Sequence, residues 1–221
     1  QCAGGRDTLS LLNLGAHEVV GVDISDEMIA CATAKSEALG VNATWYRCDL
    51  LDTPHELDAT ADLVYTGRGA LCWIMDIEAW AGVVARLLKP GGSLVIEVPN
   101  FGSWQARLGP RHWFHLDVPR HLLHFERDTL TAMLGAEGFA CERWGTFSAE
   151  YDAFGMMQSL LNRVGSTPNW LFQLLIGRRA DVQPLAFAVE DRKQTRLARQ
   201  AIELSFASQR DRHRPVQFLA P

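Results

Sequence analysis

The stretch QCAGGRDTLSLLNLGAHEVVGVD, residues 1–23, decides the fold. A Gly-Gly pair stands directly before a segment with helical spacing at 7–14, and the apolar run HEVVGVD at 17–23 follows and ends in an acid. A β-branched run of this kind is typical of a buried parallel strand. Glycines ahead of a helix let the backbone approach a ligand and aim helix N–H groups at it. We therefore expect a ligand-binding turn at residues 3–5.

Helix and strand patterns alternate over residues 1–100. Ser25 is suited to cap a helix that carries Met28, Ala32 and Leu39 on one face and ends at Gly40. A second helix is expected from Asp76 to the KPGG break at 89–92, with Ile77, Trp80, Val84 and Leu88 at helical spacing. Strands are predicted at residues 17–23, 43–49, 61–67 and 93–99.

This alternation predicts the α/β fold class, with mostly parallel strands in a twisted sheet and helices on both faces. In such sheets the ligand lies beyond the carboxyl ends of the strands, and the first strand-to-helix turn supplies a glycine floor. Since no strand stands ahead of this turn, we expect the first strand to be missing just before Gln1.

The pattern changes after residue 100. The stretch 101–125 is a Trp- and His-rich loop too long for a simple connector, and long ordered loops tend to carry function. Asp128 is expected to cap a helix, and a strand is predicted at 139–147. The apolar stretch 154–177 and the charged stretch 190–206 predict further helices. We expect one domain over residues 1–221, with a cofactor-binding half at 1–100 and a substrate-side half, mainly helical, at 101–221.

Composition narrows the class of protein. The 221 residues are 48% hydrophobic and 21% charged, within the ordinary globular range. The formal net charge of -5 disfavours nucleic acid as the main partner. The five cysteines show no CxxC pair, which favours reduced thiols over a disulfide framework. No apolar run reaches the roughly 18 residues of a spanning helix, and we expect a cytoplasmic protein.

Acids follow two successive predicted strands. Asp23 stands about 20 residues past the glycines, where a strand-end acid receives the ribose hydroxyls of a nucleoside cofactor. Asp49 follows the next strand, and its carboxylate, a pure acceptor, suits an exocyclic adenine amine. The alternative for Asp49 is a helix cap or a solvated loop acid. A dinucleotide-binding enzyme would be expected to show G-x-G-x-x-G, whereas this chain has GGRDT.

Motifs in register resemble those of the class I S-adenosylmethionine-dependent methyltransferases. They are QCAGGRDT, VVGVDISDEMI, RCDLLD, DLVYTGRGALCWIMD and RLLKPGGSLVIEVPN. The later HLDVPRHLLHF and TLTAMLGAEGF are similar to the second half of bacterial small-molecule members of that superfamily. The resemblance implies a Rossmann-like fold, S-adenosylmethionine as cofactor and in-line transfer of its methyl group to a small-molecule acceptor.

The resemblance also implies cofactor-binding roles for Ala3, Gly4, Gly5, Asp23, Ile24, Asp49, Leu50, Thr66, Gly67 and Gly69. The first three would form the floor under the methionine part. The next two would hold the ribose and flank the adenine, and the following two would meet the adenine amine and ring. The last three would line the edge of the methyl-transfer chamber. Ala3 departs from the family, which usually has its first glycine there, so a methyl group stands where backbone would pass close.

Catalysis requires mainly that the protein position the nucleophile in line and exclude water, because a sulfonium methyl is already electrophilic. Where the nucleophile must lose a proton, a positioned base adds about 10²-fold or more. His115 and His121 are the candidate bases, with packing of the loop by Trp104, Trp113 and Phe114 as the alternative role of this stretch. The spacing H-x-x-H-x-D followed by H-x-x-H suggests metal ligands, but Pro110 and Pro119 interrupt the helical turns that such spacing needs, so we predict no metal site.

Other functions remain open on the sequence alone. A non-catalytic protein with the same fold is one alternative, favoured by Ala3 and the missing strand. A nicotinamide-dependent oxidoreductase is another, although its glycine spacing is lacking. An RNA methyltransferase is a third, since residues 192–214 are rich in arginine. Peripheral membrane contact through 154–177 is disfavoured against a pair of core-covering helices.

Overall fold

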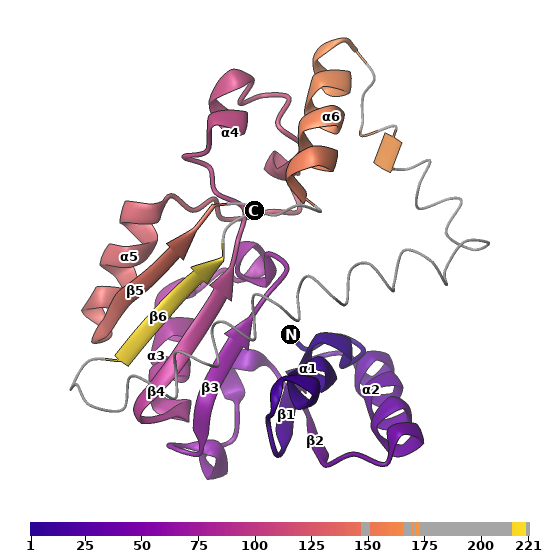
Figure 1. The fold of residues 1–221 in the computed structure, drawn as a ribbon, viewed down its shortest axis with the longest axis vertical. Helices are drawn as coiled ribbons and strands as arrows, with labels where there is room; N and C mark the ends of the chain where they lie inside the picture. Colours follow the sequence, from indigo (N-terminus) through magenta and orange to yellow (C-terminus); the bar gives the residue numbers. More distant parts are fainter. Residues whose placement is uncertain (147–150, 166–168, 170, 173–213, 220–221) are drawn as a thin grey trace.

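Parallel strands form two sheets in the part of the chain that the computed structural model describes, which is residues 1–146, 151–165, 169, 171–172 and 214–219 (Figure 1). Strand β1 (Val19–Asp23) pairs with β2 (Ala43–Arg47). A four-stranded sheet has the order β3 (Ala61–Thr66), β4 (Leu88–Glu97), β6 (Arg214–Leu219), β5 (Phe139–Gly145). All these pairings are parallel, which confirms the predicted α/β class.

Helices connect the strands as expected for parallel pairing. They are α1 (Arg6–Ser10), α2 (Asp26–Leu39), α3 (Ile77–Leu87), α4 (Trp104–Leu108), α5 (Arg127–Ala136) and α6 (Tyr151–Arg163). Short 3-10 turns lie at Leu11–Leu14, Leu50–Asp52, His55–Leu57, Ala70–Trp73 and Phe114–Leu116. The charged stretch 190–206, for which a helix is predicted, lies outside the described residues. No helix in the described ranges is long and apolar enough to cross a membrane.

The ends of α2 are those predicted, but its buried face is different. Ser25 Oγ accepts a hydrogen bond from the Met28 backbone N–H at 3.3 Å, and Gly40 ends the helix at φ +62°. Of the three residues expected to share a buried face, only Ala32 is buried, whereas Met28 and Leu39 are 36% and 64% exposed. The second buried residue is Ser36, whose hydroxyl accepts from the indole of Trp45 on β2 at 3.0 Å.

Strand β4 begins earlier than predicted. In its pairing with β3, Ala61 lies opposite Leu88 and Leu63 lies opposite Ser93, with a shift of register between these two pairs, and the pairing continues to Thr66 opposite Ile96. The KPGG segment at 89–92 is therefore a bulge within the strand rather than a break before it. Helix α3 ends at Leu87 instead, so Leu88 belongs to the strand.

Helix α5 also begins two residues earlier than predicted. Glu126, not Asp128, is its N-cap, and Glu126 and Thr129 form a capping box in which the Thr129 hydroxyl accepts from the Glu126 N–H at 3.3 Å. Asp128 lies in the first turn, where a carboxylate is favourable to the helix dipole.

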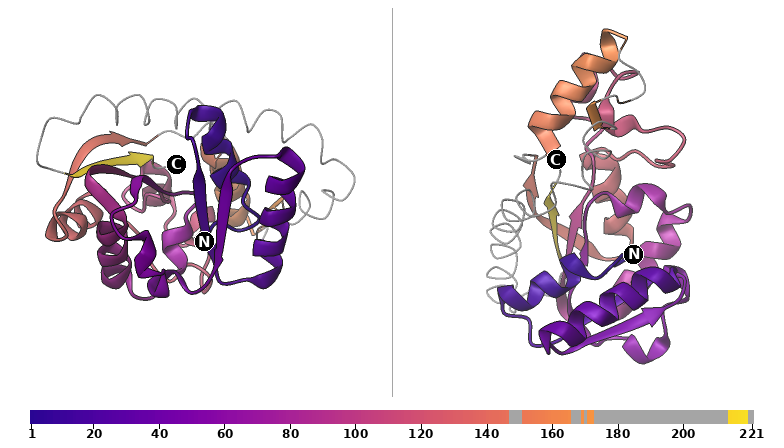
Figure 2. Two further views of the ribbon diagram at one scale, coloured as in Figure 1. Left: turned by 90° about the horizontal axis from the view of Figure 1, so that it is seen from below. Right: turned by 90° about the vertical axis from the view of Figure 1, so that its right-hand side faces the viewer.

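The core lies between the four-stranded sheet and helices α3 and α5, which cover one of its faces (Figures 1 and 2). Its fully buried side chains include Leu71, Trp80, Val84, Leu88, Leu94, Ile96, Leu130 and Leu134. Burial of a large apolar side chain contributes about 1.5–3 kcal/mol. This packing fixes the ends of β3 and β4 in place.

A second layer, here called the cap, consists of residues 103–124 and α6. In Figures 1 and 2, α4 and α6 stand together beyond the carboxyl ends of the strands. Polar contacts join the two parts of the cap: Phe114 N donates to Ser159 Oγ at 2.9 Å, and Asn162 Nδ2 donates to the His112 carbonyl at 3.2 Å. Trp113 is 3% exposed, as a packing role requires, but Trp104 is 62% exposed. The packing role expected for Trp104 is therefore wrong.

Candidate functional site

The N-terminal turn and Asp23 are joined directly. The Ala3 N–H donates to Asp23 Oδ2 at 2.8 Å, and the Ser25 N–H donates to Asp23 Oδ1 at 3.0 Å. The Cys2 N–H donates to the Val22 carbonyl at 2.8 Å, so the turn runs beside the end of β1. The carboxylate thus bridges the glycine turn and the start of α2, and its side chain is only 12% exposed.

The turn has a strained backbone position and a tightly packed one. Ala3 has φ +46° and Gly5 has φ +74°, both in the left-handed region that favours glycine. A Cβ on Gly5 would lie 2.6 Å from Trp45 Cη2 and 2.7 Å from the Ala32 Cβ. Gly5 is therefore required by packing within the fold. Beside it, Lys35 Nζ donates to the Gly4 carbonyl at 2.7 Å.

Asp49 follows the end of β2, and Asp23 is the last residue of the neighbouring strand β1. The register aligns Asp23 with Arg47, and the Cys48 N–H donates to the Asp23 carbonyl at 3.1 Å. Asp49 is exposed, and its Oδ1 accepts from the Leu51 N–H at 2.9 Å as the cap of the 3-10 turn Leu50–Asp52. The capping alternative is therefore observed, and it leaves the carboxylate at the same edge of the sheet as Asp23.

Two hydrophobic residues flank these acids. Ile24 follows Asp23 and is 64% exposed, so its side chain can contact a ligand at this edge. Leu50 follows Asp49 and packs partly buried against the core cluster.

The predicted chamber edge, residues 66–69 at the end of β3, lies beside α1. Arg68 Nε is 3.7 Å from Asp7 Oδ2, and Asp7 is in the helix that begins after the glycine turn. This ion pair brings the chamber edge and the turn together across the two sheets. Gly69 has φ +71°, and a Cβ there would meet Pro99 at 3.3 Å.

Glu97 at the end of β4 is a residue that we did not predict for the site. Its Oε2 accepts from the Arg68 N–H at 3.2 Å and from the Tyr65 hydroxyl at 3.3 Å. Burial raises the pKa of Glu97, and burial together with the Glu97 charge raises the pKa of Tyr65 well above its usual value. The available signal was an acid inside the apolar run SLVIEVP, where a buried charge needs partners.

The two candidate histidines have different surroundings. The Nδ1 of His121 is 2.8 Å from the His115 carbonyl oxygen, and its ring meets the exposed Trp73 edge-on at 5.9 Å. His115 packs against Phe114 at 5.0 Å and against Gly155 of α6. His121 therefore faces the 3-10 turn that continues from the chamber edge, whereas His115 belongs to the interior of the cap.

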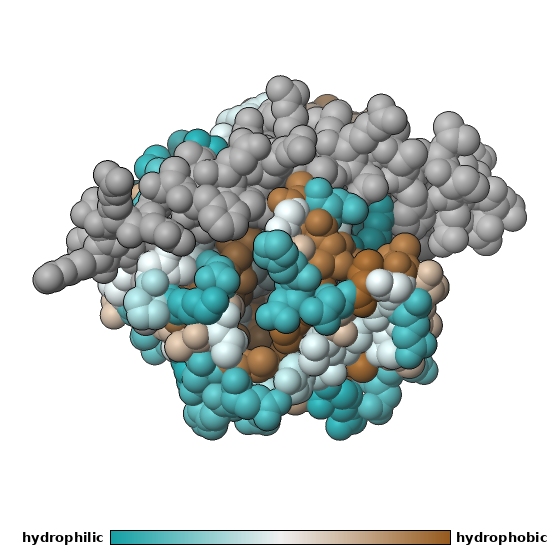
Figure 3. Space-filling view, turned by 60° about the horizontal axis from the view of Figure 1, so that its bottom comes forward, coloured by the Kyte–Doolittle hydropathy of each residue, from teal (hydrophilic) through white to brown (hydrophobic). Residues whose placement is uncertain are grey.

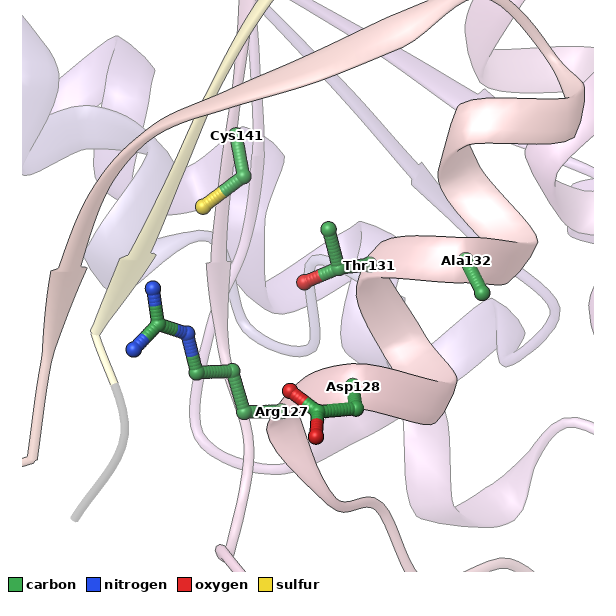
Figure 4. Close-up of a pocket in the computed structure, with 5 residues that line it drawn as sticks. All are labelled: Arg127, Asp128, Thr131, Ala132 and Cys141. Atoms are coloured by element: carbon green, nitrogen blue, oxygen red, sulfur yellow. The ribbon is translucent and has the colours of Figure 1, made fainter.

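A pocket lies between α5 and β5, outside all the predicted site residues. Arg127, Asp128, Thr131, Ala132 and Cys141 line it (Figure 4). The Arg127 guanidinium lies 5.6 Å from the Trp144 ring, and burial raises the pKa of the Cys141 thiol. Among the described residues, no group of three His, Cys, Asp or Glu side chains could hold a metal ion.

Hydrophobic residues line a hollow on the face shown in Figure 3, which looks at the molecule with the bottom of Figure 1 brought forward. Exposed apolar side chains also occur on β1, where Val20 is 45% exposed. No further strand pairs with β1 in the described part of the chain, where its one partner is β2. The strand expected before Gln1 stays a prediction.

Comparison with known proteins finds similarity to methyltransferases. Residues 1–92 match the family model of a methyltransferase domain. The chain is 30% identical over 129 residues to the ribosomal protein L11 methyltransferase of Shewanella halifaxensis, covering 54% of this chain and 39% of that protein. It is 32% identical over 111 residues to the mitochondrial ubiquinone biosynthesis O-methyltransferase of Homo sapiens, covering 49% of this chain and 30% of that protein. The YcgJ protein of Bacillus subtilis superposes with a TM-score of 0.52 at 23% identity, over 63% of this chain and 59% of that one.

The parallel strands and the helices between them form an α/β domain of the Rossmann-like kind, with Asp23 and Asp49 at its strand ends. The match of residues 1–92 to a methyltransferase domain and the fold shared with YcgJ are those expected of the class I S-adenosylmethionine-dependent methyltransferase superfamily. The chain spans 39% and 30% of the length of the two curated relatives.

The donor and acceptor groups at this edge fit the nucleoside half of S-adenosylmethionine. Each Asp23 oxygen accepts one backbone N–H, and a carboxylate oxygen has a second lone pair for a ribose hydroxyl. The exposed carboxylate of Asp49 suits an amine donor, and Ile24 offers an apolar face beside it. These residues would hold the adenosine, and the chamber edge would lie by the methyl group.

Proposed function

We propose that this chain transfers a methyl group from S-adenosylmethionine to a small-molecule acceptor. The observation that carries the proposal is the Asp23 carboxylate, which the Ala3 and Ser25 N–H groups fix at the carboxyl end of β1. Two backbone donors orient the carboxylate, and the remaining lone pairs of its oxygens can accept from paired hydroxyls. When bound, the cofactor supplies an electrophilic methyl group, and the chain's own task is to orient the acceptor and exclude water.

His121 is the better placed of the two candidate bases. A carbonyl oxygen only accepts hydrogen bonds, so the contact with the His115 carbonyl puts the proton on Nδ1 and leaves the lone pair on Nε2. The Trp73 ring beside His121 gives an acceptor a flat apolar surface. We infer that Nε2 takes the proton from a hydroxyl or ammonium acceptor, and that His115 orients His121 through its carbonyl.

The small-molecule acceptor is supported by the resemblance of HLDVPRHLLHF and TLTAMLGAEGF to small-molecule methyltransferases, and the net charge of -5 is against a polyanionic one. A protein acceptor is the second candidate, because one curated relative is named for a ribosomal protein. We place the reaction in the cytoplasm. Incubation with methyl-labelled S-adenosylmethionine and a cell extract separates the candidates, since label in the low-mass fraction supports the first and label in protein the second.

Calorimetric titration with S-adenosylhomocysteine tests the binding site. Asp23→Ala is expected to abolish binding, whereas Asp26→Ala is the matched control, because Asp26 is exposed and pairs only with the exposed Arg47 side chain among the contacts that the structure gives it. His121→Ala is expected to bind normally and to turn over more slowly, whereas His115→Ala keeps the carbonyl that His121 contacts and is expected to slow turnover less. Urea unfolding of each variant shows whether lost binding reflects lost folding.

The outcomes are distinct. If the Asp23 variant bound S-adenosylhomocysteine with the wild-type affinity, Asp23 would not be part of the cofactor site. Absence of binding by the unaltered chain would favour a non-catalytic protein with this fold, and binding of NADH instead would favour an oxidoreductase. Methyl transfer to RNA that weakens steeply with salt would favour the RNA methyltransferase alternative.

A further inference from the structure

The chamber edge, residues 66–69, is held from two sides by carboxylates. On one side, Glu97 binds it through both side chain and main chain: Oε2 accepts from the Arg68 N–H at 3.2 Å, and the Glu97 carbonyl accepts from the Gly69 N–H at 3.0 Å. On the other side, Asp7 faces the Arg68 guanidinium at 3.7 Å. The edge therefore has fixed anchors on β4 and on α1.

This arrangement is needed because the edge has an unfavourable backbone. Arg68 has φ +57° and Gly69 has φ +71°, two consecutive residues in the left-handed region. For a non-glycine residue this conformation costs about 1–2 kcal/mol. Hydrogen bonds to a charged group are worth about 1.5–3 kcal/mol, which is enough to offset that cost.

Tyr65 completes the cluster. Its hydroxyl donates to Glu97 Oε2 at 3.3 Å, and its ring lies so close to Gly67 that a Cβ there would be 2.0 Å from the hydroxyl oxygen. A side chain at 67 is thus excluded, and the main chain of the edge passes directly beside the Tyr65–Glu97 pair.

We propose that Glu97 is a positioning residue whose carboxylate holds the main chain of residues 66–69 in the conformation that methyl transfer requires. This rests on the proposed function. Glu97 contacts the Arg68 N–H and not the acceptor. It therefore fixes the backbone that lines the chamber and takes no proton from the acceptor. Its loss is expected to lower kcat more than it raises the KM for the cofactor, whose adenosine contacts lie on β1 and β2.

Ionisation of Glu97 lowers the stability of the fold, although the carboxylate binds the main chain of the chamber edge. The groups that face it are Tyr65 from β3, Arg68 from the edge and Asp7 from α1. Burial raises the pKa of Glu97, so its ionised form is less favourable in the folded chain than in the unfolded one. Stability is therefore lost as the pH rises from the pKa of Glu97 in the unfolded chain to its higher pKa in the folded chain. Glu97→Gln, which removes the charge but keeps an acceptor oxygen, is therefore expected to be at least as stable as the wild type at pH 8.

The test combines amide hydrogen exchange with steady-state kinetics. Glu97→Ala is expected to speed exchange of the Arg68 amide about tenfold or more, the equivalent of one charged hydrogen bond, and to lower kcat. Glu97→Gln is expected to restore most of both. Glu56→Ala is the matched control, because Glu56 accepts from the Tyr46 hydroxyl at 2.7 Å in an exposed pair that includes none of residues 66–69. It is expected to change neither measurement.

Arg68 exchange that is unchanged in Glu97→Ala would overturn the proposal, whatever the enzyme does. So would an unchanged kcat, or a Glu97→Gln variant no better than Glu97→Ala. The exchange measurement needs no cofactor. If the wild type fails to transfer methyl groups, the proposed function falls, while Arg68 exchange still decides whether Glu97 holds the edge.

Discussion

Substitution of Gly5 by alanine tests the packing beneath the N-terminal turn. Gly5 has φ +74°, where an L-residue costs about 1–2 kcal/mol. Alanine recovers about 0.4–1 kcal/mol of this by restricting the unfolded chain, which leaves about 1 kcal/mol. The new Cβ would also lie 2.6 Å from Trp45 and 2.7 Å from Ala32, and overpacking of this kind costs about 1–3 kcal/mol. We expect Gly5→Ala to lower the free energy of unfolding by about 2–4 kcal/mol.

Gly40→Ala isolates the backbone part of this cost. Gly40 has φ +62°, but its added Cβ would have nothing within 4 Å, so we expect a loss of only about 1 kcal/mol. In urea unfolding followed by circular dichroism, with a slope of about 2 kcal/mol per molar urea, the midpoint should fall by about 1–2 M for Gly5→Ala and by about 0.5 M for Gly40→Ala. Equal shifts for the two variants would refute the reasoning, because only one of them introduces an overlap.

Two further predictions concern Ala3 and the buried thiol of Cys72. Ala3→Gly should stabilise the chain by about 0.5–1 kcal/mol, because φ +46° strains alanine and not glycine; Ala59→Gly, at φ +51° and away from the turn, should stabilise similarly, and a lower urea midpoint for Ala3→Gly would contradict this. Burial raises the pKa of Cys72 to about 12, so only about one molecule in 10⁴ is thiolate at pH 8. Iodoacetamide should therefore label the exposed Cys31 first and reach Cys72 only in urea, as mass spectrometry of digests would show; equal rates in the folded chain would contradict the burial.

Much of the fold could be predicted because local signals agree with the tertiary structure. Ser25 and Gly40 mark the ends of α2, since a hydroxyl cap and a left-handed glycine each act within one turn. The strand positions follow from short β-branched runs, which parallel sheets bury on both faces. The predictions were wrong where contacts with residues distant in the sequence determine the local structure. The KPGG bulge depends on pairing with β3, and the buried face of α2 depends on where Trp45 packs.

The arrangement of the candidate site could be predicted only for residues at the carboxyl ends of adjacent strands. Asp23 and Asp49 meet that condition, because parallel strands bring their carboxyl ends to one edge. Glu97 escaped prediction because its role depends on the path of the backbone at Arg68, whose positive φ has no simple signal in an arginine. The surroundings of His115 and His121 could not be read from the sequence either, since they depend on contacts with Trp73 and α6.

The way in which the cap is joined to the sheet bears on how such proteins diversify. Its own contacts are both aromatic and polar, as in the rings of Phe114 and Phe154 at 5.3 Å and the bond of 2.8 Å between the buried Gln158 and Asn162 side chains. Its links to the body include the hydrogen bond of 2.8 Å from the Leu122 N–H to the Cys72 carbonyl and the ring contact of Phe101 with Trp113. Mutations inside the cap can therefore accumulate without disturbing the strand-end acids. Over evolutionary time, the acceptor preference of the proposed enzyme can drift in the cap while the proposed nucleoside site is inherited unchanged at the strand ends.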